Sequence, residues 1–188
     1  IILRISALAL KYRNMRRPKT INDEDRKVPD RERSRKRTMD RAVRLLAAKP
    51  RSVMELRSRL LERPWTDDSI VDAVIEKLKE YKYLDDDQFA RDLAASKLRQ
   101  KAQGRIKLRQ ALSRKQIDRS TLDAAIDDAF EKMPEIELID RAIDKRIRLK
   151  GRPETREDKK RFYDHLMRLG FSYGMISDRL RELGTGKD

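Results

Sequence analysis

Apolar positions recur every three or four residues through residues 84–126, which is the spacing of helices that bury one face. The first predicted helix carries an apolar stripe made of Phe89, Ala90, Leu93, Ala94 and Leu98. Two shorter stripes, Leu108 with Leu112 and Leu122 with Ile126, mark a second and a third helix. Asp85 precedes the first helix as a capping residue, and Gly104 ends it. The segment is therefore predicted to be a three-helix unit.

The same order of residue classes appears three times along the chain. The middle copy is Leu108, Leu112, Ile117, Asp118, Leu122 and Ile126. The copy 52 residues earlier is Leu56, Leu60, Trp65, Thr66, Ile70 and Val74, and the copy 54 residues later is Phe162, Leu166, Phe171, Ser172, Ile176 and Leu180. In each copy a large apolar residue precedes a capping residue, which is Thr66, Asp118 or Ser172. This recurrence predicts tandem structural repeats of about 50 residues.

We therefore expect an all-α protein, an elongated tandem array of three three-helix repeats. The predicted repeats are residues 39–83, 84–133 and 134–183, followed by a tail at 184–188. Residues 11–38 are basic and show almost no apolar periodicity, so we expect residues 1–38 to form a disordered arm, which is either a solvated tail or an arm that binds phosphates. Residues 1–10 have neither a starting methionine nor a cleavage site, and we interpret them as a product of upstream translation.

Composition narrows the class of protein further. Charged residues make up 43% of the chain and aromatic residues 5%, which favours several small helical cores over one large core. The absence of cysteine excludes a disulfide scaffold, thiol catalysis and a cysteine zinc site, and fits a reducing cytoplasm. No stretch approaches the roughly 18 apolar residues that a membrane span needs. We expect a monomeric cytoplasmic protein.

The net charge of +15 is divided between segments of opposite sign. Between Lys11 and Arg41 there are 13 Lys or Arg residues against 6 Asp or Glu, and between Arg91 and Arg119 there are 10 against 2. Residues 66–90 are the reverse, with 3 basic residues and 8 acidic ones. Such a division suits a partner with a patterned electrostatic surface, or a nucleic acid.

The candidate contact residues come from the basic segment between Arg91 and Arg119. They are Lys97, Arg99, Lys101, Arg105, Lys107, Arg109, Arg114 and Lys115. Because the leucines of this helix face inward, the long basic side chains are predicted to point outward. The alternative is a solvated face that only aids solubility. On this interpretation, changing Arg105, Lys107 and Arg109 together to Glu is expected to alter stability by only about 1 kcal/mol.

Residues suited to catalysis or to metal binding are sparse. His165 is the only histidine, and we interpret it as a surface or boundary residue. Asp85, Asp86 and Asp87 point in different directions around a helix start and lack a calcium loop, so capping is their predicted role. Without a phosphate loop or a nucleophile beside a histidine, we expect no enzyme activity and no cofactor. Acidic starts of the third helices, such as Asp67, disfavour insertion into a DNA groove.

The middle copy resembles the bacterial RecX family of regulatory proteins. The matching residues are Leu84, Asp85, Asp86, Phe89, Ala90, Gly104, Lys107, Leu108, Leu112 and Ile117, and Leu169, Gly170 and Phe171 resemble the family's closing element. The resemblance covers roughly residues 39–183. Gln116 and Lys82 stand where the family commonly has glycine, and Ala111 where it often has an acidic residue. The resemblance implies an all-helical modular protein that lodges in the groove of the RecA–DNA filament.

Two functional hypotheses follow. The resemblance implies a non-enzymatic regulator that inhibits the ATPase, strand-exchange and coprotease activities of the RecA filament in recombination and the SOS response, with weak or indirect contact to single- or double-stranded DNA. The alternative, based on the charge of +15 and the basic arm, is a helical protein that binds nucleic acid directly.

Overall fold

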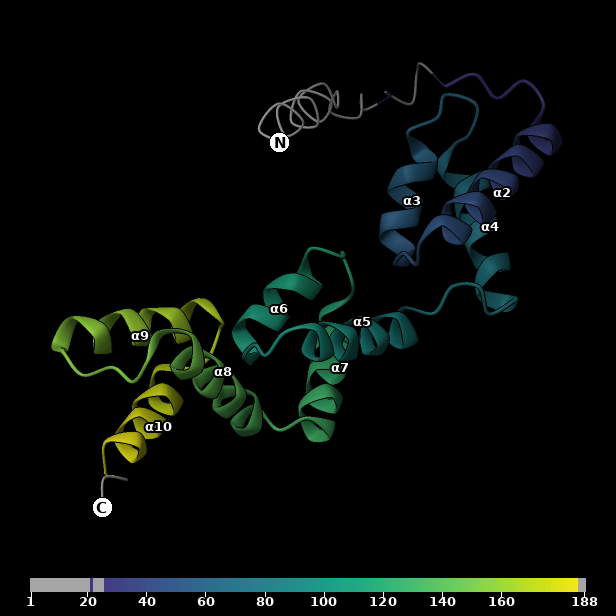
Figure 1. Cartoon of the computed structure of the whole chain (residues 1–188). Helices are drawn as coiled ribbons and strands as arrows, with labels where there is room; N and C mark the ends of the chain where they lie inside the picture. Colours follow the sequence, from purple (N-terminus) through teal and green to yellow (C-terminus); the bar gives the residue numbers. More distant parts are fainter. Residues whose placement is uncertain (1–20, 22–25, 186–188) are drawn as a thin grey trace. The chain divides into compact units, whose positions relative to one another are not determined.

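The computed structural model describes residue 21 and residues 26–185, and all regular structure in this part of the chain is helical (Figure 1). The helices in order are α2 (Arg31–Ala48), α3 (Val53–Leu61), α4 (Asp68–Glu80), α5 (Asp86–Gln100), α6 (Arg105–Ser113), α7 (Arg119–Lys132), α8 (Glu135–Lys150), α9 (Arg156–Arg168) and α10 (Tyr173–Thr185). The all-α prediction is confirmed. Within the described residues, no helix is both long and apolar enough to span a membrane.

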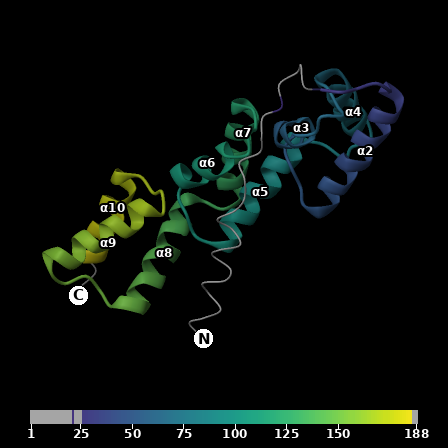
Figure 2. The same cartoon turned by 90° about the horizontal axis from the view of Figure 1, so that it is seen from above.

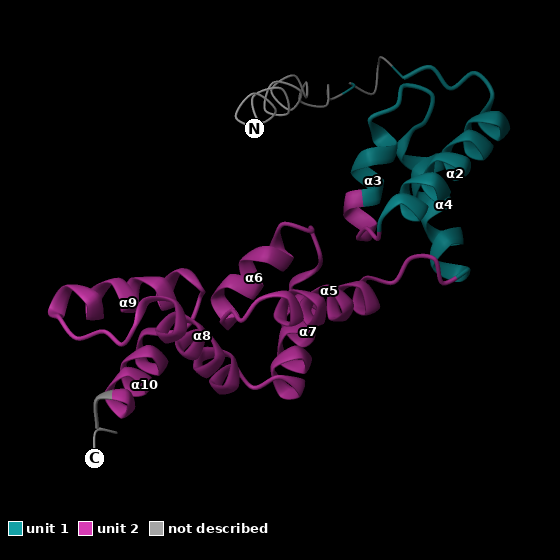
Figure 3. Cartoon of the chain, viewed as in Figure 1, with its two compact units in different colours: residues 1–49, 56–81 teal, residues 50–55, 82–188 magenta. Residues whose placement is uncertain are grey.

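The helices belong to two compact units (Figure 3). One unit comprises residues 1–49 and 56–81, and the other comprises residues 50–55 and 82–188. In the second unit, α5 packs on α7, and α9 contacts both α8 and α10 (Figures 1 and 2). One continuous hydrophobic core runs from Ala90 to Ile176. The second and third helix triplets therefore share a core, which the repeat pattern did not reveal.

The first unit corrects the predicted boundary of the basic arm. Helix α2 begins at Arg31 rather than near Met39, with Asp30 accepting a hydrogen bond from the Arg33 amide at 2.9 Å. Its inward face carries small residues, and Ser34 and Thr38 are buried. A search for apolar periodicity misses such a face. Residues 1–20 and 22–25 of the predicted arm, and residues 186–188 of the predicted tail, lie outside the described residues.

Capping was predicted correctly at some helix starts and wrongly at another. Asp85 accepts a hydrogen bond from the Gln88 amide at 2.9 Å. Asp118 accepts one from the Ser120 amide at 2.9 Å, and the Ser120 hydroxyl also bonds it, which lowers the pKa of Asp118. The prediction that Thr66 caps α4 is wrong: Asp67 is the cap. Thr66 is buried, and its hydroxyl lies 3.1 Å from the hydroxyl of Thr38 in α2.

Among the described residues, two that are not glycine adopt left-handed backbone geometry. Lys82 has a φ of 58° and Gln116 a φ of 55°. Both stand where the RecX pattern commonly has glycine. The left-handed region costs a residue with a Cβ about 1–2 kcal/mol.

Replacing Lys82 or Gln116 by glycine is therefore expected to stabilise the protein. Glycine gives the unfolded chain more conformational freedom, which lowers stability by about 0.4–1 kcal/mol. Relief of the Cβ strain is expected to exceed this cost. The expected gain in the free energy of unfolding is about 0.5–1 kcal/mol for each variant, measured by urea denaturation. Gln110→Gly, at an exposed position inside α6, is the control and should lose about 1 kcal/mol. A loss at Gln116 equal to that at Gln110 would contradict the left-handed geometry.

A backbone contact joins the start of α6 to the turn after α9. The Gly104 amide donates to the Leu169 carbonyl at 2.8 Å, and the Ile106 amide donates to the Gly170 carbonyl at 3.2 Å. A Cβ on Gly104 would lie 2.2 Å from the Gly170 oxygen. Gly170 itself has a φ of 87°, and a Cβ there would lie 2.4 Å from the Lys107 Cβ. A left-handed glycine is typical of a helix end, but no local pattern indicates that these two glycines meet.

Candidate functional site

The predicted contact surface on α6 is largely paired within the molecule. Arg105 forms an ion pair with Asp127, and Arg109 forms one with Asp123, both from α7. The Arg105 guanidinium also lies 4.9 Å from the centre of the Phe130 ring. These two arginines hold α6 against α7, so they are less available to a partner than their sequence positions suggested.

Two further predicted contact residues also have partners. The Lys107 ammonium donates to the Arg168 carbonyl at 3.0 Å, and the Lys115 ammonium lies 3.3 Å from a Glu55 carboxylate oxygen within the second unit. Changing Arg105, Lys107 and Arg109 to Glu would place carboxylates beside Asp127 and Asp123. The expectation that this change alters stability by only about 1 kcal/mol is thus corrected, because it replaces two ion pairs by two repulsions.

The other four predicted contact residues form no ion pair with a described acidic residue, so they can contact a partner. Arg99, Lys101 and Arg114 are exposed, and Lys97 is half-buried. No acidic residue in the described part of the chain forms an ion pair with any of the four. Arg99 and Lys101 lie at the C-terminal end of α5, whereas Arg114 follows α6. The structure thus divides the predicted surface and leaves Arg99 and Lys101 at the edge of a groove.

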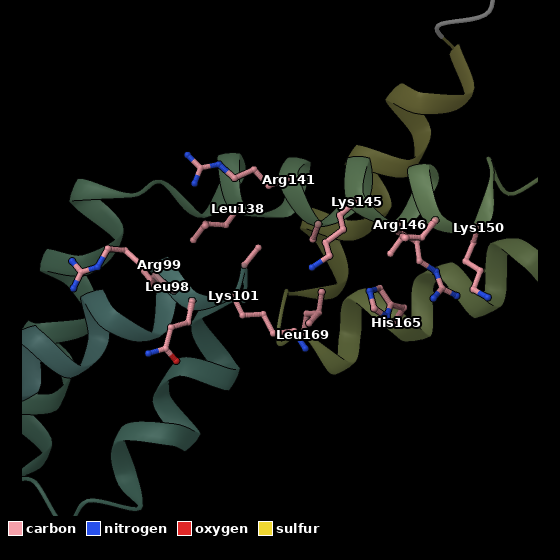
Figure 4. Close-up of a pocket in the computed structure, with 14 residues that line it drawn as sticks. Leu98, Arg99, Lys101, Leu138, Arg141, Lys145, Arg146, Lys150, His165 and Leu169 are labelled. Carbon is pink, nitrogen blue, oxygen red and sulfur yellow. The ribbon is translucent and has the colours of Figure 1, made fainter. Parts of the chain in front are cut away.

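This groove, which we call the α5–α8–α9 groove, has a volume of about 330 Å³ and lies wholly within the second unit (Figure 4). Figure 4 shows Lys101 at the end of α5 and Lys145 on α8 approaching it from two sides, with Leu169 between them. The aliphatic lining residues are Leu98, Ala102, Leu138, Ala142, Leu149 and Leu169. The groove therefore combines an apolar floor with a cationic rim.

The electrostatics of the α5–α8–α9 groove are one-sided. Its basic lining residues are Arg99, Lys101, Arg141, Lys145, Arg146, Lys150 and His165, and none of its lining residues is acidic. Burial lowers the pKa of His165, and the nearby positive charges, Arg146 first, lower it further, so the imidazole is neutral at neutral pH. The buried Nε of Arg146 makes no hydrogen bond to any described residue. The groove is thus suited to attract an anionic ligand.

The contribution of α8 was missed by the sequence analysis. The clearest pattern in this segment is the helical spacing of its isoleucines, Ile136, Ile139, Ile143 and Ile147. A signal was nevertheless present, because Arg141 and Lys145 are four residues apart and therefore share one face of the helix. Their position opposite Lys101 depends on how the second and third helix triplets pack, and no local pattern gives that packing.

The first unit carries a separate group of arginines around the single tryptophan. The Arg37 guanidinium lies 3.9 Å from the centre of the Trp65 ring, and that of Arg63 lies 5.5 Å from it. Burial lowers the pKa of Arg41, and so does the nearby charge of Arg63. Arg37 and Arg41 are one helical turn apart on α2. In the repeat pattern Trp65 is only the apolar residue before a cap, whereas in the structure it is half-buried beneath arginines.

Comparison with known proteins agrees with this architecture. Residues 39–78 match the model described as RecX, first three-helix domain, and residues 85–126 match RecX, second three-helix domain. A regulatory protein RecX from Chlorobaculum tepidum is 32% identical over 76% of this chain and 86% of its own length. The chain belongs to the RecX family. The relative from Prosthecochloris aestuarii is 31% identical over 80% of this chain and 95% of its own length.

Relatives within the RecX family differ in length. The matched part covers only 55% of the RecX protein from Bacillus velezensis, which is 30% identical to this chain. The crystal structure of RecX from Lactobacillus salivarius superimposes with a TM-score of 0.69 over 81% of this chain and 98% of that chain, at 19% identity. A second RecX crystal structure gives a TM-score of 0.66 at 22% identity. These structures support the helical fold that both share with this chain.

Proposed function

We propose that this protein is a non-enzymatic cytoplasmic regulator that binds a RecA-type recombinase filament on DNA and inhibits its ATPase, strand-exchange and coprotease activities. Membership in the RecX family carries the proposal. The α5–α8–α9 groove supports it, because basic side chains surround an apolar floor and, of these, Arg99, Lys101 and Lys145 form no ion pair with a described acidic residue. A filament that exposes acidic protein surface and DNA phosphate would attract such a surface.

Changing Arg99 and Lys101 to Glu is expected to weaken inhibition of RecA-driven ATP hydrolysis at least about tenfold, equivalent to about 1.4 kcal/mol of binding. Neither side chain is paired in the described structure, so the change should leave the fold intact. The measurement is the concentration of protein that halves ATP hydrolysis by RecA on single-stranded DNA.

The matched control changes Arg91 and Arg148 to Glu. Arg91 is exposed on α5 and Arg148 on α8, and neither lines the groove. This control reverses the same number of charges, one on α5 and one on α8, so it should inhibit within about twofold of the parent, as expected for screened surface charge. Equal losses in both variants would mean that net charge, rather than the groove, decides binding.

Direct binding of nucleic acid is the second candidate, and the arginines around Trp65 favour it. Basic side chains interleaved with an aromatic ring are typical of single-strand binding surfaces. Binding to naked single-stranded DNA and to the same DNA coated with RecA and nucleotide separates the two candidates. Tighter binding to the coated DNA supports the regulator, whereas equal binding that collapses as salt rises supports the direct DNA binder.

A further inference from the structure

The α5–α8–α9 groove exposes apolar surface inside a ring of positive charge. Leu149 on α8 is 68% exposed, although it lines the groove. Leu98, Leu138 and Leu169 are almost fully buried, so the groove reaches down to the edge of the hydrophobic core. An exposed leucine that continues a core into a concave site marks a place where an apolar group can dock.

The lining favours a peptide over a nucleic acid as the occupant. Single-stranded nucleic acids gain much of their affinity by stacking bases on aromatic rings. No Phe, Tyr or Trp lines the groove, and the one ring among its lining residues is the imidazole of His165. The floor is made of branched aliphatic and methyl groups, which pack best around another aliphatic side chain. The phosphates of a nucleic acid could pair with the basic residues of the rim, but a nucleic acid has no aliphatic side chain to pack on the apolar floor.

The positive charges come from separate helices, so they can contact anionic groups on more than one side of a side chain that enters the groove. Arg99 and Lys101 come from the end of α5, and Lys145 and Lys150 come from α8. The C-terminal ends of α5 and α8 present carbonyl groups that repel an anion slightly. Long lysine and arginine side chains carry their charge beyond those carbonyls, so the net field at the rim still favours carboxylates.

From these features we infer that the α5–α8–α9 groove binds an acidic peptide segment of a partner protein that inserts an aliphatic side chain between α5 and α8. The segment's carboxylates would lie against Lys101 and Lys145, and its aliphatic side chain would cover Leu149. The inference rests on the proposed function, because it takes the partner to be protein in the recombinase filament rather than its DNA.

The test uses the full chain and three labelled probes. The first is a synthetic peptide in which leucines are flanked by Asp and Glu, the second is the same peptide with its leucines replaced by serine, and the third is an oligothymidylate of equal net charge. Fluorescence anisotropy gives the affinity of each probe, and filament inhibition is measured on the same preparations. The expected order of affinity is leucine peptide, then oligothymidylate, then serine peptide.

Two groove variants and one control sharpen the test. Lys145→Glu should weaken leucine-peptide binding at least about tenfold, whereas Arg148→Glu on the same helix should change it by no more than about twofold. Leu149→Ser should weaken binding of the leucine peptide and leave binding of the serine peptide unchanged. The side chains of Lys145 and Leu149 are exposed, and Lys145 forms no ion pair with a described residue. Neither substitution is therefore expected to cause misfolding that mimics a loss of binding.

Several outcomes would overturn the inference. Serine and leucine peptides that bind equally would show that the floor takes no part. Oligothymidylate binding more tightly than the leucine peptide, with Lys145→Glu affecting it most, would assign the groove to DNA. Self-association that Leu149→Ser abolishes would assign it to a second copy of this chain. If the leucine peptide binds as expected but no groove variant alters filament inhibition, the groove has the inferred chemistry and the proposed function fails at this site.

Discussion

Gly104→Ala is expected to lower the free energy of unfolding by about 3 kcal/mol or more, because a Cβ at this position meets backbone rather than a flexible side chain. The added atom would lie 2.2 Å from the Gly170 oxygen and 2.5 Å from the Phe171 nitrogen. The chain must separate there to relieve the overlap. That movement would stretch the hydrogen bonds that the Gly104 and Ile106 amides donate to Leu169 and Gly170.

The effect of Gly104→Ala should extend beyond stability. The same contact fixes α6 against the turn after α9, and Leu169 in that turn lines the α5–α8–α9 groove. Binding at the groove is therefore expected to weaken in any fraction that remains folded. Urea denaturation followed by circular dichroism measures the loss of stability, and the anisotropy measurement measures the loss of binding.

Gly174→Ala provides the matched control. It makes the same substitution near the start of α10, where a Cβ would meet nothing within 4 Å. Alanine favours the helix over glycine by up to about 1 kcal/mol, so this variant should be neutral or slightly stabilised. Equal unfolding midpoints for Gly104→Ala and Gly174→Ala would show that the two chain segments do not approach as closely as the structure has them.

Leu112→Ala is expected to cost about 2–5 kcal/mol, the range for a fully buried leucine whose surroundings relax only in part. Leu112 is completely buried in α6 and belongs to the continuous core of the second unit. Because that core also contains residues of α8, α9 and α10, the cavity should weaken the second and third helix triplets together. A single shifted transition in circular dichroism would report this shared loss.

Ile106→Ala on the same helix is the control for Leu112→Ala. Ile106 is 50% exposed, so its truncation should cost no more than about 1 kcal/mol. Trp65 is the only tryptophan and belongs to the first unit, so its fluorescence follows a part of the chain that contains neither substitution. A cost below about 0.5 kcal/mol for Leu112→Ala would show that the core has been placed wrongly.

Helix identity was predictable because it depends on local spacing. Leu108 and Leu112 lie four residues apart and are both fully buried, as the apolar periodicity predicted. Asp85 and Asp118 cap their helices because a short side-chain oxygen reaches an amide two or three residues ahead. Thr66 shows the limit of this reasoning: a contact with Thr38, distant in sequence, occupies its hydroxyl and leaves capping to Asp67.

The candidate site was only partly predictable. Residues 97–101 were identified from their charge, and Arg99 and Lys101 do lie on the groove. Arg105 and Arg109 belonged to the same basic stretch, yet their charges are paired with Asp127 and Asp123. A sequence shows which side chains are charged. Whether a basic side chain can bind a partner depends on the carboxylates that folding brings within about 4 Å of it.

By itself the sequence determined the all-helical class, the threefold recurrence of a helix triplet, the caps at Asp85 and Asp118 and the resemblance to the RecX family, since all of these depend on spacings within a few tens of residues. Only the tertiary structure decided that two triplets share one core, that Gly104 meets Gly170, and that Lys145 faces Lys101 across an apolar floor. These features join residues more than 40 positions apart. Their contacts depend on how whole helices pack, which the local periodicity of either segment does not specify.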